Sequence, residues 1–81
     1  MKYKEGDLLV VLWHDISSND GWVAIEDAKT MEPLRPVSCG FLLEEDGEYI
    51  RLTNTYLPDS CNVLIIPKSN IDKIVKAKFK A

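Results

Sequence analysis

The sequence has few of the residues that build metal centres, phosphate sites or membrane spans. Its two cysteines, Cys39 and Cys61, and its single histidine complete no usual zinc-ligand pattern. The four glycines are scattered and form no phosphate-binding loop. The longest apolar run covers residues 8–13, far below the roughly 20 residues that cross a bilayer. We therefore expect no metal, no cofactor and no membrane association.

The sequence also opens without a charged and then apolar leader, which favours a protein of the cytoplasm. In that compartment both thiols are expected to be reduced. Hydrophobic residues make up 46% and charged residues 28%, which is ordinary for a globular chain, so we expect an ordered, soluble protein. The length of 81 residues predicts a single small domain over positions 1–81.

The net charge of −3 is unevenly distributed along the chain. Residues 5–48 hold eleven acids against Lys29 and Arg35, whereas residues 68–80 hold five lysines against Asp72. Such lysines can form a basic patch for nucleic acid. They are also typical of an edge strand protected against edge-to-edge association, and we favour this second interpretation.

Residues 37–56, VSCGFLLEEDGEYIRLTNTY, predict a β-hairpin. Asp46-Gly47 is a dipeptide favoured where both central residues of a two-residue turn need positive φ. With that turn, Leu43 faces Ile50 and Phe41 faces Leu52. Side chains alternate between faces, and the predicted core face carries Val37, Cys39, Phe41, Leu43, Ile50, Leu52 and Tyr56. The other face is mostly solvated and carries Ser38, Gly40, Leu42, Glu44, Tyr49, Arg51, Thr53 and Thr55.

The remaining elements are short strands and turns. Strands are expected near residues 7–15, 37–45, 48–56, 62–67 and 72–78, with Trp13 in the core. A short helical turn over residues 24–29, with Asp20 as its N-cap, competes with a strand. Ser69-Asn70 marks a tight turn or one 3₁₀ turn. Short strands without a long helix predict a mainly β fold, either a small sandwich or a partly open barrel.

The order of these elements resembles the Src-homology-3-like small barrel: a strand, a long irregular loop, a hairpin, a strand, a 3₁₀ turn and a last strand. The segment IPKSNI, residues 66–71, also resembles the Ile/Phe-Pro-x-Asn-Tyr-Val stretch near the end of true Src-homology-3 domains. The family's ligand-contacting tyrosine falls on Asn70, and Ser38-Cys39-Gly40 stands where the family has paired tryptophans. The resemblance implies a five-stranded barrel with one short helical or 3₁₀ segment, without the binding of proline-rich peptides.

A second resemblance is one of layout. Residues 11–71 contain, in this order, the short motifs VLWxD, W, GFL, EYIxL and IPKxxI. This layout resembles that of small uncharacterised proteins of bacteriophages and prophages. This resemblance implies an accessory protein in the cytoplasm of a bacterial host, and it names no activity.

Three features invite a catalytic or metal-binding interpretation, and none of them supports it. His14 and Asp15 are neighbours on a strand and point to opposite faces, so they cannot pair with each other. The acids of residues 44–48 indicate a solvated turn, because cation sites space their ligands around a loop. A cysteine nucleophile needs a base within about 3 Å, and His14 is the sole histidine. We therefore predict a protein that is not an enzyme.

Binding is better supported than catalysis. Tyr49 and Arg51 share the outward face of the hairpin, with Leu42 across from Arg51, and Trp22 follows a glycine-containing loop. These residue types are enriched at interfaces, so Trp22, Tyr49 and Arg51 are the candidates for binding a host protein or a small ligand. The alternative is that Trp22 caps the core and Tyr49 covers an edge.

Two further partners follow from the predicted strands. A small sheet with open edges can form a homo-oligomer through its first or last strand. The alternative function is nucleic-acid binding by residues 68–80 with Tyr49 and Arg51, in the manner of barrels that stack bases on aromatic rings. The negative net charge disfavours it, because phosphate contacts need a positive field.

Overall fold

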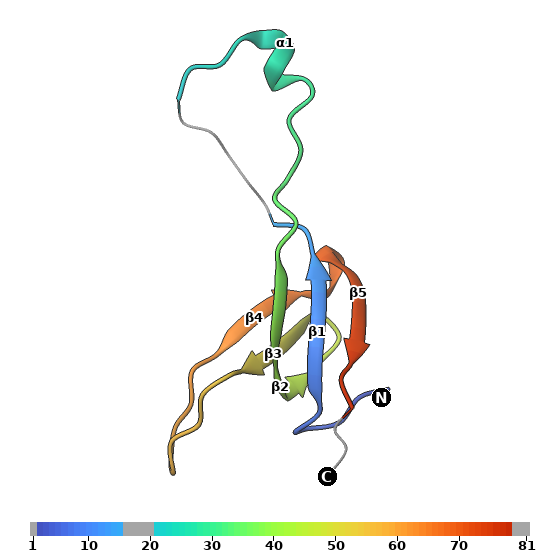
Figure 1. Cartoon of the computed structure of the whole chain (residues 1–81), viewed down its shortest axis with the longest axis vertical. Helices are drawn as coiled ribbons and strands as arrows, with labels where there is room; N and C mark the ends of the chain where they lie inside the picture. The colour runs from blue at the N-terminus through green and yellow to red at the C-terminus, as the bar shows by residue number, and fades with distance from the viewer. Residues whose placement is uncertain (1, 16–20, 79–81) are drawn as a thin grey trace.

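The computed structural model describes residues 2–15 and 21–78, and it folds them into one antiparallel sheet of five strands. The strands are, in chain order, β1 (Leu8–Trp13), β2 (Val37–Glu45), β3 (Tyr49–Thr53), β4 (Leu64–Pro67) and β5 (Ile71–Lys76). Across the sheet they lie in the order β4-β3-β2-β1-β5 (Figure 1). The predicted mainly β class is confirmed. The first strand lies inside the sheet, so it offers no edge for pairing with another copy.

The core is formed by six side chains, each at most 1% exposed: Leu9, Val11, Leu42, Ile50, Leu52 and Ile66. Burying a side chain of this size contributes roughly 1.5–3 kcal/mol. Trp13 packs against this cluster but is only partly buried, and its indole Nε1 donates to Ser38 Oγ at 2.9 Å. The prediction that Trp13 contributes to the core is therefore confirmed in its packing.

The turn of the hairpin differs from the one predicted. Asp46 Oδ1 accepts the N–H groups of Glu48 at 2.7 Å and Tyr49 at 2.8 Å, so the carboxylate holds a three-residue turn over 46–48. Among the described residues, Gly6 alone has a positive φ, and Gly47 therefore does not adopt the expected conformation. Asparagine and aspartate form such turns because the short side chain reaches the backbone two residues on.

The different turn also changes the register of the hairpin. Glu45 pairs with Ile50, and Leu42 pairs with Leu52. A bulge lies between Leu42 and Glu44. A shift of one residue moves every following side chain of a strand to the other face. The predicted pairs Leu43–Ile50 and Phe41–Leu52 are therefore wrong.

Beyond the bulge, β2 presents the opposite face to the core. Gly40 and Leu42 are buried, whereas Val37 and Cys39 are exposed and Phe41 is half-buried. A Cβ at Gly40 would lie 3.0 Å from the Thr53 carbonyl oxygen, so the glycine allows β3 to approach closely. On β3 the predicted core positions Ile50 and Leu52 are correct. Thr53 is also buried, and its hydroxyl donates to Asn62 Oδ1 at 2.7 Å.

A long excursion joins β1 to β2 and contains the four-residue helix α1 (Ile25–Ala28). It extends well beyond the sheet (Figure 1), and every residue from 21 to 35 is exposed. The predicted helical turn is confirmed, but Ala24 occupies the N-cap position without a side-chain cap bond. Asp20, the expected cap, lies outside the described residues.

The two outer strands of the sheet are joined by the 3₁₀ turn η1 (Lys68–Asn70), which confirms the 3₁₀ alternative for this segment. The β3–β4 connection forms a second projection from the sheet, and Tyr56 and Cys61 pair across it in an isolated β-bridge. No helix in the described ranges 2–15 and 21–78 has the length and apolar character needed to cross a membrane.

Candidate binding surfaces

Tyr49 and Arg51 lie together on β3, as the sequence predicts. The guanidinium carbon of Arg51 is 5.6 Å from the centre of the Tyr49 ring, within cation–π range. Arg51 Nη1 also donates to Asp46 Oδ2 at 2.8 Å. Across the hairpin Arg51 faces Glu44 and not Leu42, which is buried opposite Leu52. The charge of Arg51 is therefore already matched within the hairpin.

The pKa values of this ion pair reflect the same contacts. The Arg51 hydrogen bond and the N–H groups of Glu48 and Tyr49 lower the pKa of Asp46 from 3.8 to about 2. The Asp46 hydrogen bond in turn raises the pKa of Arg51. Two acids of the hairpin tip, Asp46 and Glu45, thus have structural partners, because Glu45 Oε2 also lies 2.7 Å from Lys68 Nζ. In the described part of the chain no three His, Cys, Asp or Glu side chains gather as a metal site.

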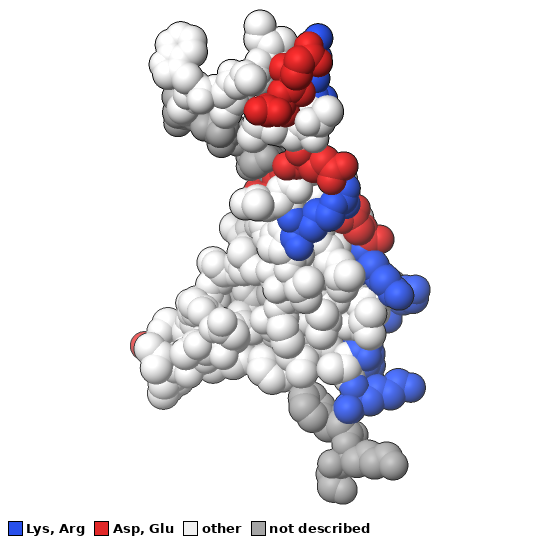
Figure 2. All heavy atoms as spheres, turned by 45° about the horizontal axis from the view of Figure 1, so that its top comes forward, with Lys and Arg blue, Asp and Glu red and all other residues white. Residues whose placement is uncertain are grey.

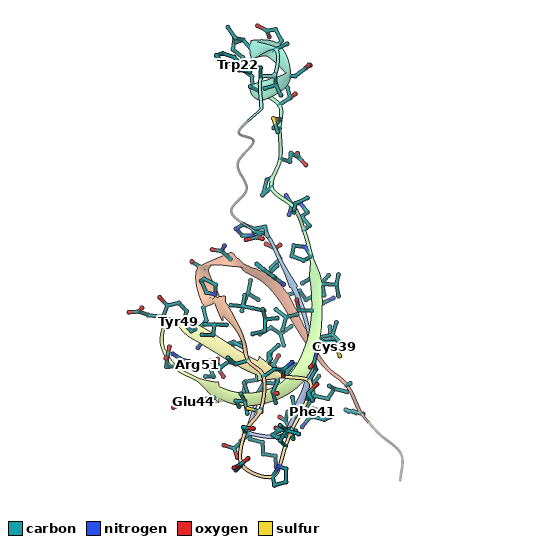
Figure 3. All side chains as sticks on the ribbon, turned by 90° about the vertical axis from the view of Figure 1, so that its left-hand side faces the viewer. Trp22, Cys39, Phe41, Glu44, Tyr49 and Arg51 are labelled. Atoms are coloured by element: carbon teal, nitrogen blue, oxygen red, sulfur yellow. The ribbon has the colours of Figure 1, made fainter. Side chains whose placement is uncertain are left out.

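Trp22 does not join Tyr49 and Arg51. It lies near the far end of the excursion, whereas the other two lie on the sheet (Figure 3). Its exposure of 102% also excludes the alternative in which Trp22 caps the core. The three predicted residues therefore belong to two separate surfaces.

The excursion carries several exposed large apolar side chains, and we call this segment the apolar arm: Trp22, Val23, Ile25, Met31 and Leu34. Ile25 is 74% exposed and Leu34 is 68% exposed. Figure 2 shows acidic side chains, with basic ones among them, at the upper end of the molecule. Single exposed apolar residues are normal on a protein surface, whereas five of them on one short segment make it a candidate interaction site.

The base of the apolar arm is fixed to the sheet by Asp72 of β5. Asp72 Oδ1 lies 3.1 Å from His14 Nδ1, and Asp72 Oδ2 lies 3.7 Å from Arg35 Nη1. The Asp15 N–H donates to the Leu34 carbonyl at 2.8 Å, so the two ends of the arm also bond to each other. His14 therefore pairs with the carboxylate of Asp72, which is distant in sequence, and not with that of its neighbour Asp15. The sequence has no local signal for this contact.

The lysines of the last strand are partly neutralised. Lys76 Nζ lies 3.3 Å from Asp7 Oδ1. The pKa of Asp7 is lowered, first by the Lys4 backbone N–H and then by Lys76. Lys73 and Lys76 lie on β5, which is an edge of the sheet. Their position fits the protected edge strand that we favoured from the sequence.

At the opposite edge, the β3–β4 projection is nearly free of charge. Residues 53–66, which we call the uncharged wing, contain Asp59 as their single charged residue. Five of their apolar side chains are exposed: Tyr56, Leu57, Val63, Leu64 and Ile65. In Figure 2 basic side chains gather on one side of the molecule, and this projection on the other side is almost wholly white.

The hollows in the surface are shallow. One of them measures about 430 Å³ and is lined by residues 6–8 and 76–78, which include Asp7, Lys76 and Lys78. A second, of about 280 Å³, lies between Tyr49 and Lys68. Ligand pockets are concave and enclose most of the ligand, whereas these hollows are open to solvent, and three of the six residues that line the first are charged. Cys39 and Cys61 are both exposed and free.

Comparison of the chain with protein-family models, with curated protein sequences and with solved structures found no match. The surfaces described above are therefore interpreted from their own chemistry.

Proposed function

We propose that this protein is a non-enzymatic binding module that engages a partner protein through the apolar arm, with Trp22 as the central anchor. The observation that carries the proposal is the complete exposure of Trp22, at 102%, on an arm with no buried residue between 21 and 35. A large aromatic ring left wholly in water contributes nothing to the sheet. Buried in a partner's pocket, it supplies the kind of contact that dominates binding free energy.

The neighbouring side chains give the arm the composition of an interface. Ile25 and Leu34 supply further apolar area, and Glu26 and Asp27 supply a charged rim. An apolar centre with a polar rim is the usual anatomy of protein–protein interfaces. We infer that the partner presents an apolar pocket for Trp22 with a polar rim, since the arm carries acids and also Lys29, whose Nζ lies 3.2 Å from Glu26 Oε1.

For the scaffold we propose a Src-homology-3-like small barrel. The support is the strand order β4-β3-β2-β1-β5, the long excursion after β1 and the 3₁₀ turn before β5. The proposal that the chain is an accessory protein of a bacteriophage or prophage, active in the cytoplasm of a bacterial host, rests on the layout resemblance. On that proposal the partner is a host protein.

The other two binding candidates have less support. A small ligand needs a concave pocket that encloses it, whereas the hollow of about 430 Å³ is shallow and has three charged residues, Asp7, Lys76 and Lys78, among the six that line it. Nucleic acid needs unpaired cations and an accessible aromatic ring, whereas Lys68, Lys76 and Arg51 lie beside Glu45, Asp7 and Asp46. The Tyr49 ring already contacts Arg51.

Site-specific photo-crosslinking in bacterial cells tests the proposed interface. A benzophenone amino acid replaces Trp22 in one variant and Val75 of β5, 44% exposed, in the control. We expect position 22 to give one dominant adduct with a different protein, and position 75 to give none. Equal labelling from both positions, or an adduct at position 22 that contains only copies of this chain, would contradict the proposal.

A further inference from the structure

The two open edges of the sheet differ in charge. The β5 edge carries Asp72, Lys73 and Lys76 within six residues. The β4 edge has the sequence LIIP and is preceded by Cys61, Asn62 and Val63, without a single charge. Charged side chains on an edge strand, lysine above all, prevent pairing with another strand, and an uncharged apolar edge permits it. Pairing is therefore opposed at β5 and permitted at β4.

The backbone of β4 shows which groups are available at this edge. The Lys68 N–H donates to the Glu48 carbonyl at 2.7 Å, and the ladder continues with Ile50 opposite Ile66 and Leu52 opposite Leu64. Bonded and non-bonded positions alternate along an antiparallel ladder. Leu64 and Ile66 therefore bond to β3, and the backbone groups of Val63 and Ile65 point away from it.

Pro67 confirms this assignment. A proline has no N–H and is tolerated in a strand where that group would point away from the ladder. Pro67 lies opposite Tyr49, at a position that alternation places among the outward-pointing residues. The outward donors of this segment are therefore the N–H groups of Val63 and Ile65, and its outward acceptors include the carbonyls of Ile65 and Pro67.

We propose that β4 pairs with β4 of a second copy of this chain, antiparallel and about a two-fold axis at Ile65. The paired copies form one continuous sheet, and the interface is independent of the apolar arm. In this register the two Ile65 residues exchange their N–H and carbonyl groups. The Val63 N–H of each copy bonds to the Pro67 carbonyl of the other. Every outward donor of the segment then has an acceptor.

A second copy fits this edge because the edge is complementary to itself. Antiparallel pairing about a two-fold axis presents the same edge to itself, so Ile65 on the axis meets Ile65 of the other copy, and a charge at that position would oppose a like charge. The edge carries no charge, and its exposed side chains are those of Val63 at 55%, Leu64 at 40% and Ile65 at 50%. The β5 edge lacks this property, since it carries the charged side chains of Asp72, Lys73 and Lys76. An unrelated strand from another protein is the competing occupant, and the tests below separate the two.

Amide hydrogen exchange on the purified wild-type chain tests the paired backbone directly. The backbone amide of Ile74, on the other edge strand β5, is the control. The Ala77 N–H donates to the Leu8 carbonyl, so alternation along β5 makes the Ile74 N–H point to the outer edge. We expect the Ile65 amide to exchange at least about tenfold more slowly as the protein concentration is raised from micromolar to millimolar. The Ile74 amide should not change. Exchange at Ile65 that is independent of concentration would overturn the proposal.

A charge placed at the axis tests the interface by mutation. Ile65→Lys introduces the residue type that protects β5, and Val75→Lys is the control at the other edge, where exposure is 44% against 50% at Ile65. By sedimentation velocity we expect a dimer for the wild type and for V75K. For I65K the dissociation constant should rise at least about tenfold, because two like charges then meet. A monomeric wild type, a dimer retained in I65K, or equal loss in both variants would overturn the proposal. If I65K fails to fold, the exchange measurement decides.

Discussion

At the scale of single residues, Asp46 and Gly40 determine how the central hairpin is built. Asp46 accepts two backbone N–H groups and the Arg51 guanidinium, so it fixes the turn. Gly40 allows β2 and β3 to approach closely where a Cβ would meet the Thr53 carbonyl oxygen. Each contact leads to a prediction that depends on one side chain.

The Asp46 carboxylate makes folding stability depend on pH. Its pKa is about 2 in the folded chain, below its ordinary value of 3.8. A lowered folded pKa means that the carboxylate stabilises the fold above pH 3.8, and that this contribution is lost as the pH falls toward 2. We expect Asp46→Asn to unfold at lower urea concentration than the wild type at pH 7. The difference between the two should shrink steadily below pH 4. A difference that is constant from pH 7 to pH 2 would contradict this role.

Gly40→Ala tests the close approach of β2 and β3. The added methyl group would lie 3.0 Å from the Thr53 carbonyl oxygen, so backbone must shift, which costs about 1–3 kcal/mol of folding free energy. Gly47→Ala is the matched control, because no atom lies within 4 Å of its added Cβ. We expect its stability to stay within about 0.5 kcal/mol of the wild type by urea titration. Equal effects in the two variants would show that the close approach does not limit stability.

At the scale of elements, Asp72 links three segments that are distant in sequence. It lies on β5, His14 follows β1, and Arg35 precedes β2. The two ends of the apolar arm therefore share one carboxylate on the edge of the sheet. The arm leaves the sheet at a defined point, although none of its residues from 21 to 35 is buried.

Asp72→Asn should loosen the base of the arm without disturbing the core. The Asp15 N–H, which bonds to the Leu34 carbonyl at 2.8 Å, reports on this junction. Exposed ion pairs contribute about 0.2–1 kcal/mol, so we expect its exchange to become roughly two- to fivefold faster. The Ile50 amide in the core should not change. Asp59→Asn, in the uncharged wing, is the control variant and should leave the Asp15 amide as it is in the wild type.

The sequence predicted elements better than it predicted faces. Alternation and turn residues place the five strands, the helical turn and the 3₁₀ turn correctly, because these depend on local spacing and local propensity. The face of β2 was predicted wrongly, because a bulge between Leu42 and Glu44 is not visible in a pattern of apolar residues. The turn at Asp46 contributed to the wrong face of β2, because the dipeptide Asp46-Gly47 is compatible with both a two-residue and a three-residue turn.

The candidate binding residues show the same limit. Tyr49 and Arg51 are two positions apart on one strand, so alternation alone brings them together. Trp22 was grouped with them on residue type, and the structure separates it because nothing in the sequence specifies where a long excursion points. The His14–Asp72 contact spans 58 residues and depends on β1 pairing with β5, which local patterns do not show.

At the scale of the whole molecule, a small charged sheet carries two apolar projections. The extents of 52 × 26 × 25 Å show an elongated shape, with the apolar arm at one end of the long axis (Figure 1). The six core residues all lie on strands. The sheet therefore supplies the stability of the protein, and the projections present its exposed apolar surface.

Replacing residues 16–34 with a short Gly-Ser linker tests this division of roles. Because the arm buries no side chain between 21 and 35, we expect the sheet to fold and the melting temperature to fall by no more than about 5 °C. Thermal unfolding followed by circular dichroism measures the change. Loss of cooperative unfolding would show that the arm is needed for the fold, and its exposed side chains would then require another explanation.

The affinity of the photo-crosslinked partner for the wild type and for Trp22→Ala, measured by calorimetry, tests the proposed function most directly. Anchor residues of an interface contribute 2 kcal/mol or more, so we expect Trp22→Ala to weaken binding at least about thirtyfold. Val75→Ala, outside the arm, should stay within about twofold of the wild type. If Trp22→Ala binds as tightly as the wild type, the apolar arm is not the binding surface and the account is wrong.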